Sequence, residues 1–87
     1  MDFMKRLLKG ILQSLLVFFF KTKWREMGDA IRDIVLSYMD KDMDSEEKRK
    51  QAYRDIRKLV KDAGLTVAGS ILALILEMSY QVEKKND

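Results

Sequence analysis

Apolar residues recur every three or four positions along most of this chain, which is the spacing of amphipathic α-helices. Four such runs can be delimited, at residues 4–22, 24–39, 45–63 and 66–83. Short polar or glycine-containing stretches separate them, near residues 21–24, 40–44 and 64–66. The pattern predicts an all-α fold of four helices, arranged as a compact bundle or as helical hairpins.

Several residues match the signals that start and stop helices. Asp44 followed by Glu47 resembles a capping box at the start of the third helix. Gly64 stands where a left-handed C-terminal cap belongs, and Leu65 can make the hydrophobic contact that accompanies such a cap. Thr66 is then expected to cap the N-terminus of the fourth helix.

The first run changes character along its length. Its first half has a polar face, but residues 15–20 (LLVFFF) are apolar on every side, and basic residues and a tryptophan follow at once. A bilayer span needs about 20 apolar residues, whereas the fourteen of residues 7–20 include Lys9. This favours an amphipathic helix lying in the membrane interface. The residues expected to contact lipid are Phe3, Leu7, Leu8, Ile11, Leu12, Leu15, Phe18, Phe19 and Phe20. Those expected to anchor it at the headgroups are Lys5, Lys9, Lys21, Lys23, Trp24 and Arg25.

The fourth run is the most apolar, since residues 63–76 carry no charge. A helix that is apolar nearly all round must be buried in protein or lipid. The first helix could instead pack against the fourth in a soluble bundle, and the periodicity alone leaves both arrangements open. No linker or internal repeat divides residues 1–87, so we expect a single helical unit. Residues 1–25 form its membrane-contacting part, and residues 26–87 form the bundle.

Composition narrows the possible functions. The 87 residues include neither Cys nor His, so the chain has no thiol nucleophile, no imidazole base and no Cys/His zinc site. The acidic residues of the 40–44 turn do not complete a calcium loop, because Ser45 and Gln51 occupy the positions that need Gly and Glu. We therefore expect no enzyme activity, no cofactor, no metal and no small-molecule substrate.

Charge is distributed in blocks along the chain. Residues 1–25 and residues 48–63 each carry a net charge of +5, whereas residues 26–47 hold eight acidic residues against Arg32 and Lys41. A basic face on the third helix could neutralise phosphates of lipid or nucleic acid. It consists of Lys50, Arg54, Arg57, Lys58 and Lys61. A solvated face that binds no partner is the commoner meaning of such a row of charges. Among binding partners lipid is favoured over nucleic acid, because no base-reading motif or aromatic stacking platform accompanies these residues.

Three segments carry a resemblance to a known family: residues 45–52 (SEEKRKQA), residues 61–67 (KDAGLTV) and residues 74–82 (LILEMSYQV). Together with the apolar N-terminal helix, they are similar to the LLH family of bacteriophage holins (holin superfamily 6). The resemblance covers residues 24–83. It implies a small phage protein that associates with the bacterial inner membrane and self-assembles to permeabilise it during host lysis.

The sequence is therefore consistent with two main classes of function. The first is the holin-like protein, a homo-oligomer at an anionic inner membrane. The second is a soluble, cytoplasmic helical module that binds a protein partner or a second copy of itself. Nucleic-acid binding through the basic face is a weaker third hypothesis.

Overall fold

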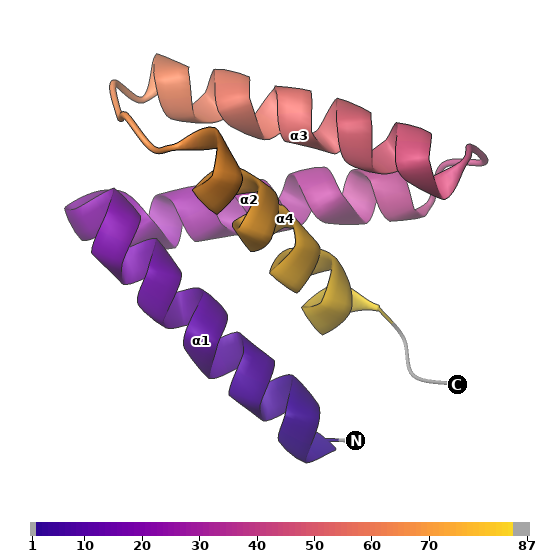
Figure 1. The fold of residues 1–87 in the computed structure, drawn as a ribbon, viewed down its shortest axis with the longest axis horizontal. Helices are drawn as coiled ribbons and strands as arrows, with labels where there is room; N and C mark the ends of the chain where they lie inside the picture. Colours follow the sequence, from indigo (N-terminus) through magenta and orange to yellow (C-terminus); the bar gives the residue numbers. More distant parts are fainter. Residues whose placement is uncertain (1, 85–87) are drawn as a thin grey trace.

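The first half of the chain is helical almost without interruption. In the computed structural model, which describes residues 2–84, helix α1 (Asp2–Phe20) runs into a 3-10 turn, η1 (Lys21–Lys23), and then directly into α2 (Trp24–Met39) (Figure 1). Helices α3 (Ser45–Asp62) and α4 (Gly69–Glu83) follow after short loops. The all-α prediction is confirmed for these residues. The prediction of four separate helices is corrected to three continuous helical stretches, because η1 joins α1 to α2.

Lys21 turns the chain between α1 and α2. Its φ angle of 55° lies in the left-handed region, which a residue with a side chain occupies at a cost of about 1–2 kcal/mol. The 3-10 turn η1 begins at this residue, and the chain changes direction between α1 and α2 (Figure 1). The expected break near residues 21–24 is thus a bend.

Helices α2 and α3 run antiparallel across the polar loop 40–44 (Figure 1). Asp44 occupies the N-cap position of α3, as predicted, but its side chain makes no capping hydrogen bond. Gly64 adopts a φ of 76° just after α3. The Leu65 amide donates to the Val60 carbonyl at 3.1 Å and the Gly64 amide donates to the Lys61 carbonyl at 3.0 Å, which is the Schellman pattern.

The start of α4 differs from the prediction. The helix begins at Gly69 with Ala68 at the N-cap, so Thr66 does not cap it. Leu65 and Val67 are instead packed against the core from an extended segment. The free energy gained by packing these two side chains against the core outweighs the local tendency of Thr66 to cap a helix.

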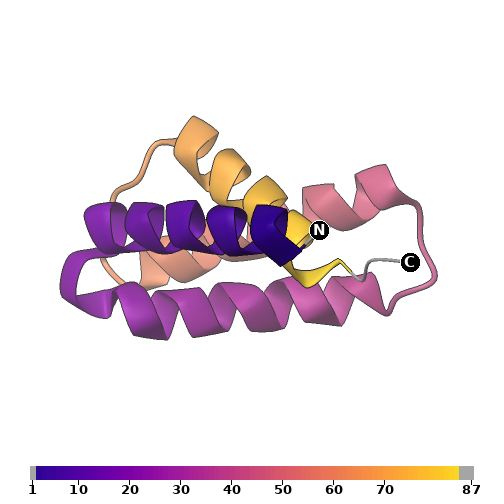
Figure 2. The same cartoon turned by 90° about the horizontal axis from the view of Figure 1, so that it is seen from below.

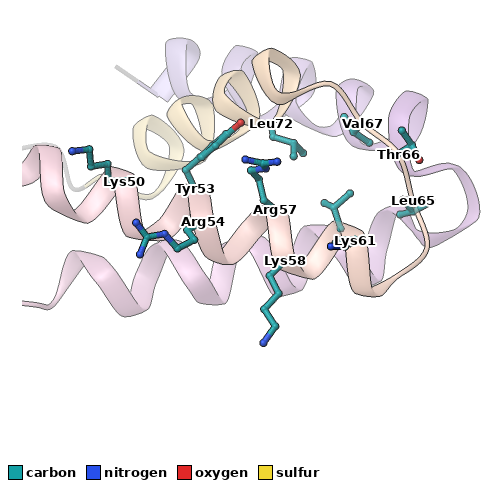
Figure 3. Close-up of a pocket in the computed structure, with 11 residues that line it drawn as sticks. Lys50, Tyr53, Arg54, Arg57, Lys58, Lys61, Leu65, Thr66, Val67 and Leu72 are labelled. Carbon is teal, nitrogen blue, oxygen red and sulfur yellow. The ribbon is translucent and has the colours of Figure 1, made fainter.

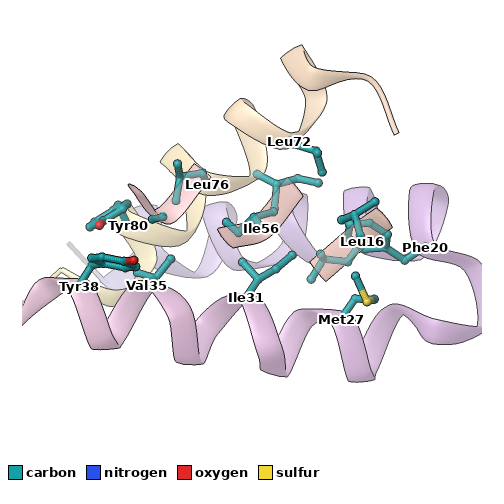
Figure 4. Packing of buried hydrophobic residues seen from close by; sticks show 13 residues of the cluster. Leu16, Phe20, Met27, Ile31, Val35, Tyr38, Ile56, Leu72, Leu76 and Tyr80 are labelled. Carbon is teal, nitrogen blue, oxygen red and sulfur yellow. The ribbon is translucent and has the colours of Figure 1, made fainter. Parts of the chain in front are cut away.

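All four helices contribute to one hydrophobic core (Figure 4). Its centre contains Phe20, Ile31, Val35, Ile56 and Ile75, one or two from each helix and all almost fully buried. Because Leu16 and Phe20 of α1 belong to this core, the N-terminal helix is part of the bundle.

Helices α2 and α4 each contact all three of the other helices. Figures 1 and 2 show α1 and α3 on opposite sides of the molecule, with α4 and α2 between them. Among the described residues, α1 and α3 do not contact each other. The Cα radius of gyration of 12.5 Å is close to the value of about 12 Å expected for a folded chain of this length.

Candidate functional site

Helix α1 exposes a row of large apolar side chains on the face directed away from the core. Phe3 and Phe18 are 72% and 70% exposed, and Leu7 and Ile11 are each nearly half exposed. Spacings of four, four and seven residues place these side chains on one side of an α-helix. We call these four residues the apolar stripe of α1. Phe3 and Phe18 stand about 22 Å apart along the helix axis at 1.5 Å per residue.

Two small residues lie within the stripe and leave a shallow hollow of about 690 Å³ over the middle of the helix. No atom lies within 4 Å of the position that a Cβ atom of Gly10 would occupy. The Ser14 hydroxyl donates to the Gly10 carbonyl at 3.0 Å, so its polar group is already satisfied within the helix. The hollow therefore presents a mainly apolar surface, with Arg6 at its edge.

The other side of α1 contacts α2 and α4, which divides the predicted lipid-contacting residues into two groups. Phe3, Leu7, Ile11 and Phe18 face outward, whereas Leu8, Leu12, Leu15 and Phe19 are half-buried. Phe20 is only 1% exposed, so the prediction that it contacts lipid is corrected: its ring fills the core beside Met27 and Leu16 (Figure 4).

The predicted headgroup anchors have different environments. Lys9 and Lys21 are exposed, and Lys5 is half-buried. Lys23 donates through Nζ to the Ala63 carbonyl at 2.9 Å, where it satisfies the C-terminal end of α3. Trp24 is packed against the core, with the Arg25 guanidinium 5.2 Å from its ring centroid. The sequence alone does not show that Lys23 and Trp24 make contacts within the fold whereas Lys9 and Lys21 are exposed to solvent.

The basic face predicted on the third helix lies on the outer side of α3. All five of its residues are exposed, and they line a second hollow, of about 630 Å³, between α3 and the segment that leads into α4 (Figure 3). Sequence reasoning missed the residues that complete this hollow. They are Tyr53, Val60, Leu65, Thr66, Val67 and Leu72. The predicted cap at Gly64 was the sequence signal that could have identified these residues. A cap of this kind ends α3 and turns the following segment back toward the helix.

The outer side of α2 carries the opposite charge. Glu26, Asp29 and Asp33 are exposed there, beside the exposed Arg25 and Arg32 of the same helix, and the exposed Asp40 follows its last residue. The acidic block thus extends from α2 through the 40–44 loop into the first turn of α3, whereas the two basic blocks lie mainly on α1 and on the rest of α3. Three surfaces can be distinguished: an apolar one on α1, an acidic one on α2 and a basic one on α3.

Two buried tyrosines have altered acidity. A hydrogen bond from Tyr38 to the Asp55 carboxylate, together with burial, raises the pKa of the Tyr38 phenol above its usual value. Burial raises the pKa of Tyr80, against the opposing effect of Arg49. Each tyrosine lies at the edge of the core beside charged groups, and neither faces one of the two hollows.

Within residues 2–84, no three acidic side chains come close enough to hold a metal ion. None of the helices in that range combines the length and the apolar character needed to cross a bilayer. Comparison of the chain with family models, curated proteins and solved structures finds no match.

Proposed function

We propose that this protein is a holin-like protein that binds the anionic surface of a bacterial inner membrane through the apolar stripe of α1. The observation that carries the proposal is the exposure of four large apolar side chains on one face of one helix. Contiguous exposed apolar surface of this kind is typical of membrane or protein contacts.

The geometry supports an α1 that lies flat in the headgroup region. Only the outer face of the helix enters the apolar layer, so Leu16 and Phe20 can remain in the core. Basic residues stand near both ends of α1, with Arg6 in its second turn and Lys21 just after its last. Their side chains can reach lipid phosphates while the stripe is inserted.

The expected binding is reversible. Complete burial of a Leu or Phe side chain contributes about 1.5–3 kcal/mol. Because the stripe residues are already partly covered by the protein, insertion into lipid should contribute about 1–2 kcal/mol for each of them. Each basic residue near an acidic leaflet adds about 1 kcal/mol. Four apolar contacts then give about as much free energy as a single myristoyl chain, which alone holds a protein only marginally.

Self-association of bound copies is the second part of the proposal and rests on the family resemblance. Reversible binding lets copies accumulate on one leaflet before they associate. Association would place the polar side of α1, including Gln13, beside water and open a lesion. This part is tested separately, by the release of a trapped dye from vesicles.

Binding is tested by sedimentation with vesicles of phosphatidylglycerol and phosphatidylcholine, using Leu7→Asp and Leu74→Asp as a matched pair. Leu7 and Leu74 have the same side chain and are 48% and 46% exposed, but Leu74 lies on α4. The change at Leu7 should weaken binding to acidic vesicles at least tenfold, whereas the change at Leu74 should alter it less than threefold. Equal losses, or retained binding by the Leu7 variant, would contradict the proposed role of α1. Circular dichroism confirms that both variants are folded.

A second candidate occupant of the same face is another copy of the chain, which corresponds to the soluble interaction module. The hollow over Gly10 and Ser14 favours it, since small residues let two helices approach closely. This candidate predicts a stable dimer without lipid, measurable by sedimentation equilibrium. A monomer that binds vesicles would exclude it.

A further inference from the structure

The hollow beside α3 combines a basic rim with an apolar wall. Leu65 and Val67 form part of its wall, from the segment between α3 and α4, and the nearly buried Leu72 lies at its base. The basic rim is the predicted face of α3, from Lys50 to Lys61. We call this site the basic hollow (Figure 3). Its volume of about 630 Å³ falls in the range of ordinary ligand sites.

The positive charge of the rim is not neutralised within the fold. The ion pairs among residues 2–84 join Arg32 to Glu83 and Arg49 to Glu77, and neither involves a residue of the rim. Five like charges along three turns of one helix repel one another. An anion bound in the hollow would relieve this repulsion.

The side chains of the rim have different directions. Figure 3 shows Arg57 rising from α3 toward Leu72. Its neighbour Lys58 also lines the hollow, but the ammonium end of its side chain extends in the opposite direction. The Arg57 guanidinium lies 5.9 Å from the centroid of the Tyr53 ring. The Tyr53 hydroxyl donates to the Gly69 carbonyl at 3.3 Å, which ties this ring to the start of α4. Arg57 is thus the cation aimed at the apolar wall.

We infer that the basic hollow binds an acidic phospholipid, with the phosphate at Arg57 and the first part of an acyl chain against Leu65 and Val67. Arginine can bind a phosphate through two hydrogen bonds. A free phosphate would leave the apolar wall unused. The hollow holds one aromatic ring, that of Tyr53, whereas single-stranded nucleic acid is bound by several rings on which successive bases stack. The site is separate from the apolar stripe, because α1 and α3 lie on opposite sides of the molecule (Figure 1).

The first test is an amide NMR titration with dihexanoylphosphatidylglycerol below its micelle concentration. It uses the Leu7→Asp variant, so that the outcome does not depend on the proposed role of α1. Saturable shifts are expected at Leu65 and Val67, with at least tenfold weaker binding of dihexanoylphosphatidylcholine and of glycerol 3-phosphate. Equal binding of glycerol 3-phosphate would overturn the lipid assignment in favour of a simple anion site. Tighter binding of a DNA oligonucleotide would overturn it in favour of nucleic acid.

The second test compares Arg57→Gln with Lys58→Gln, which remove the same charge from adjacent positions. Arg57→Gln should weaken lipid binding at least tenfold, and Lys58→Gln less than threefold. Equal effects would show only general attraction by a basic surface and would overturn the inference.

Gly69→Ala tests the shape of the hollow without changing its charge. A Cβ atom at residue 69 would come within 2.6 Å of the Tyr53 hydroxyl and force the ring to move. We expect a loss of affinity of at least threefold. Unchanged affinity in this variant would contradict the inference that the lipid fits the hollow shaped by the Tyr53 ring.

Discussion

The hydroxyl group of Tyr38 donates a hydrogen bond of 2.7 Å to the carboxylate of Asp55 and so connects α2 to α3 at the edge of the core. Tyr80 is also buried, but its hydroxyl has no hydrogen-bond partner among the described residues. Replacing each tyrosine with Phe should therefore have different effects. Tyr38→Phe should lower the free energy of unfolding by about 1–2 kcal/mol, whereas Tyr80→Phe should leave it unchanged or raise it by up to about 1 kcal/mol. Urea unfolding of the two variants measures the difference, and equal losses would contradict it.

The same hydrogen bond predicts a dependence of stability on alkaline pH. The folded-state pKa of Tyr38 is raised above the ordinary tyrosine value of about 10. A raised pKa means that the folded state holds the proton more tightly than the unfolded state does. Its contribution to stability is complete below pH 10 and is lost as the pH rises through the folded-state pKa. The stability advantage of the wild type over Tyr38→Phe should therefore shrink above pH 10. A constant difference between pH 8 and pH 11 would contradict this prediction.

The bend at Lys21 can be relieved by glycine. Glycine adopts a φ of 55° without the steric cost that Lys21 incurs, so Lys21→Gly should stabilise the fold by about 0.5–1 kcal/mol. Lys21→Ala is the control, because it removes the same charge but retains the strain. The thermal midpoint of the glycine variant should exceed that of the alanine variant by a few degrees. Equal midpoints would indicate that the left-handed conformation carries no cost here.

A substitution at Gly10 distinguishes the two partners proposed for the outer face of α1, which are the lipid bilayer and a second copy of the chain. The space around it is open, so Gly10→Leu adds an apolar side chain without a clash. It should strengthen vesicle binding about threefold to tenfold if the stripe inserts into lipid. The same change would fill the hollow that a second copy needs and would weaken a dimer. Gly10→Ala is the smaller companion change, and it should raise helix stability by about 0.5–1 kcal/mol in either case.

Helix positions were largely predictable from the sequence, because they follow from local spacing and capping. The end of α3 at Gly64 depends on one left-handed residue, and that residue is visible in the sequence. The start of α4 was not predictable in the same way. Thr66 carries a local capping signal, but the packing of Leu65 and Val67 against distant residues determines where α4 begins.

The exposed face of α1 could be predicted only in part. Consecutive residues on a helix point about 100° apart, so Phe18, Phe19 and Phe20 cannot share one environment. Periodicity identifies which apolar residues lie on the same side, but both sides of this segment are apolar. The choice of Phe20 for the core and Phe18 for the surface depends on how α2 and α4 pack against α1. That information lies outside the segment itself.

The exposed acidic residues Glu26, Asp29 and Asp33 of α2 and the basic residues of α1 and α3 distribute charge unevenly over the molecule. Near an anionic surface such a charge distribution experiences a torque, which turns the acidic side of α2 away within a Debye length of about 10 Å at 0.1 M salt. The rate at which the protein arrives should therefore fall steeply with ionic strength. Its rate of departure, which is governed by apolar contacts, should depend on salt much less. Orientation would thus be selected before contact is made.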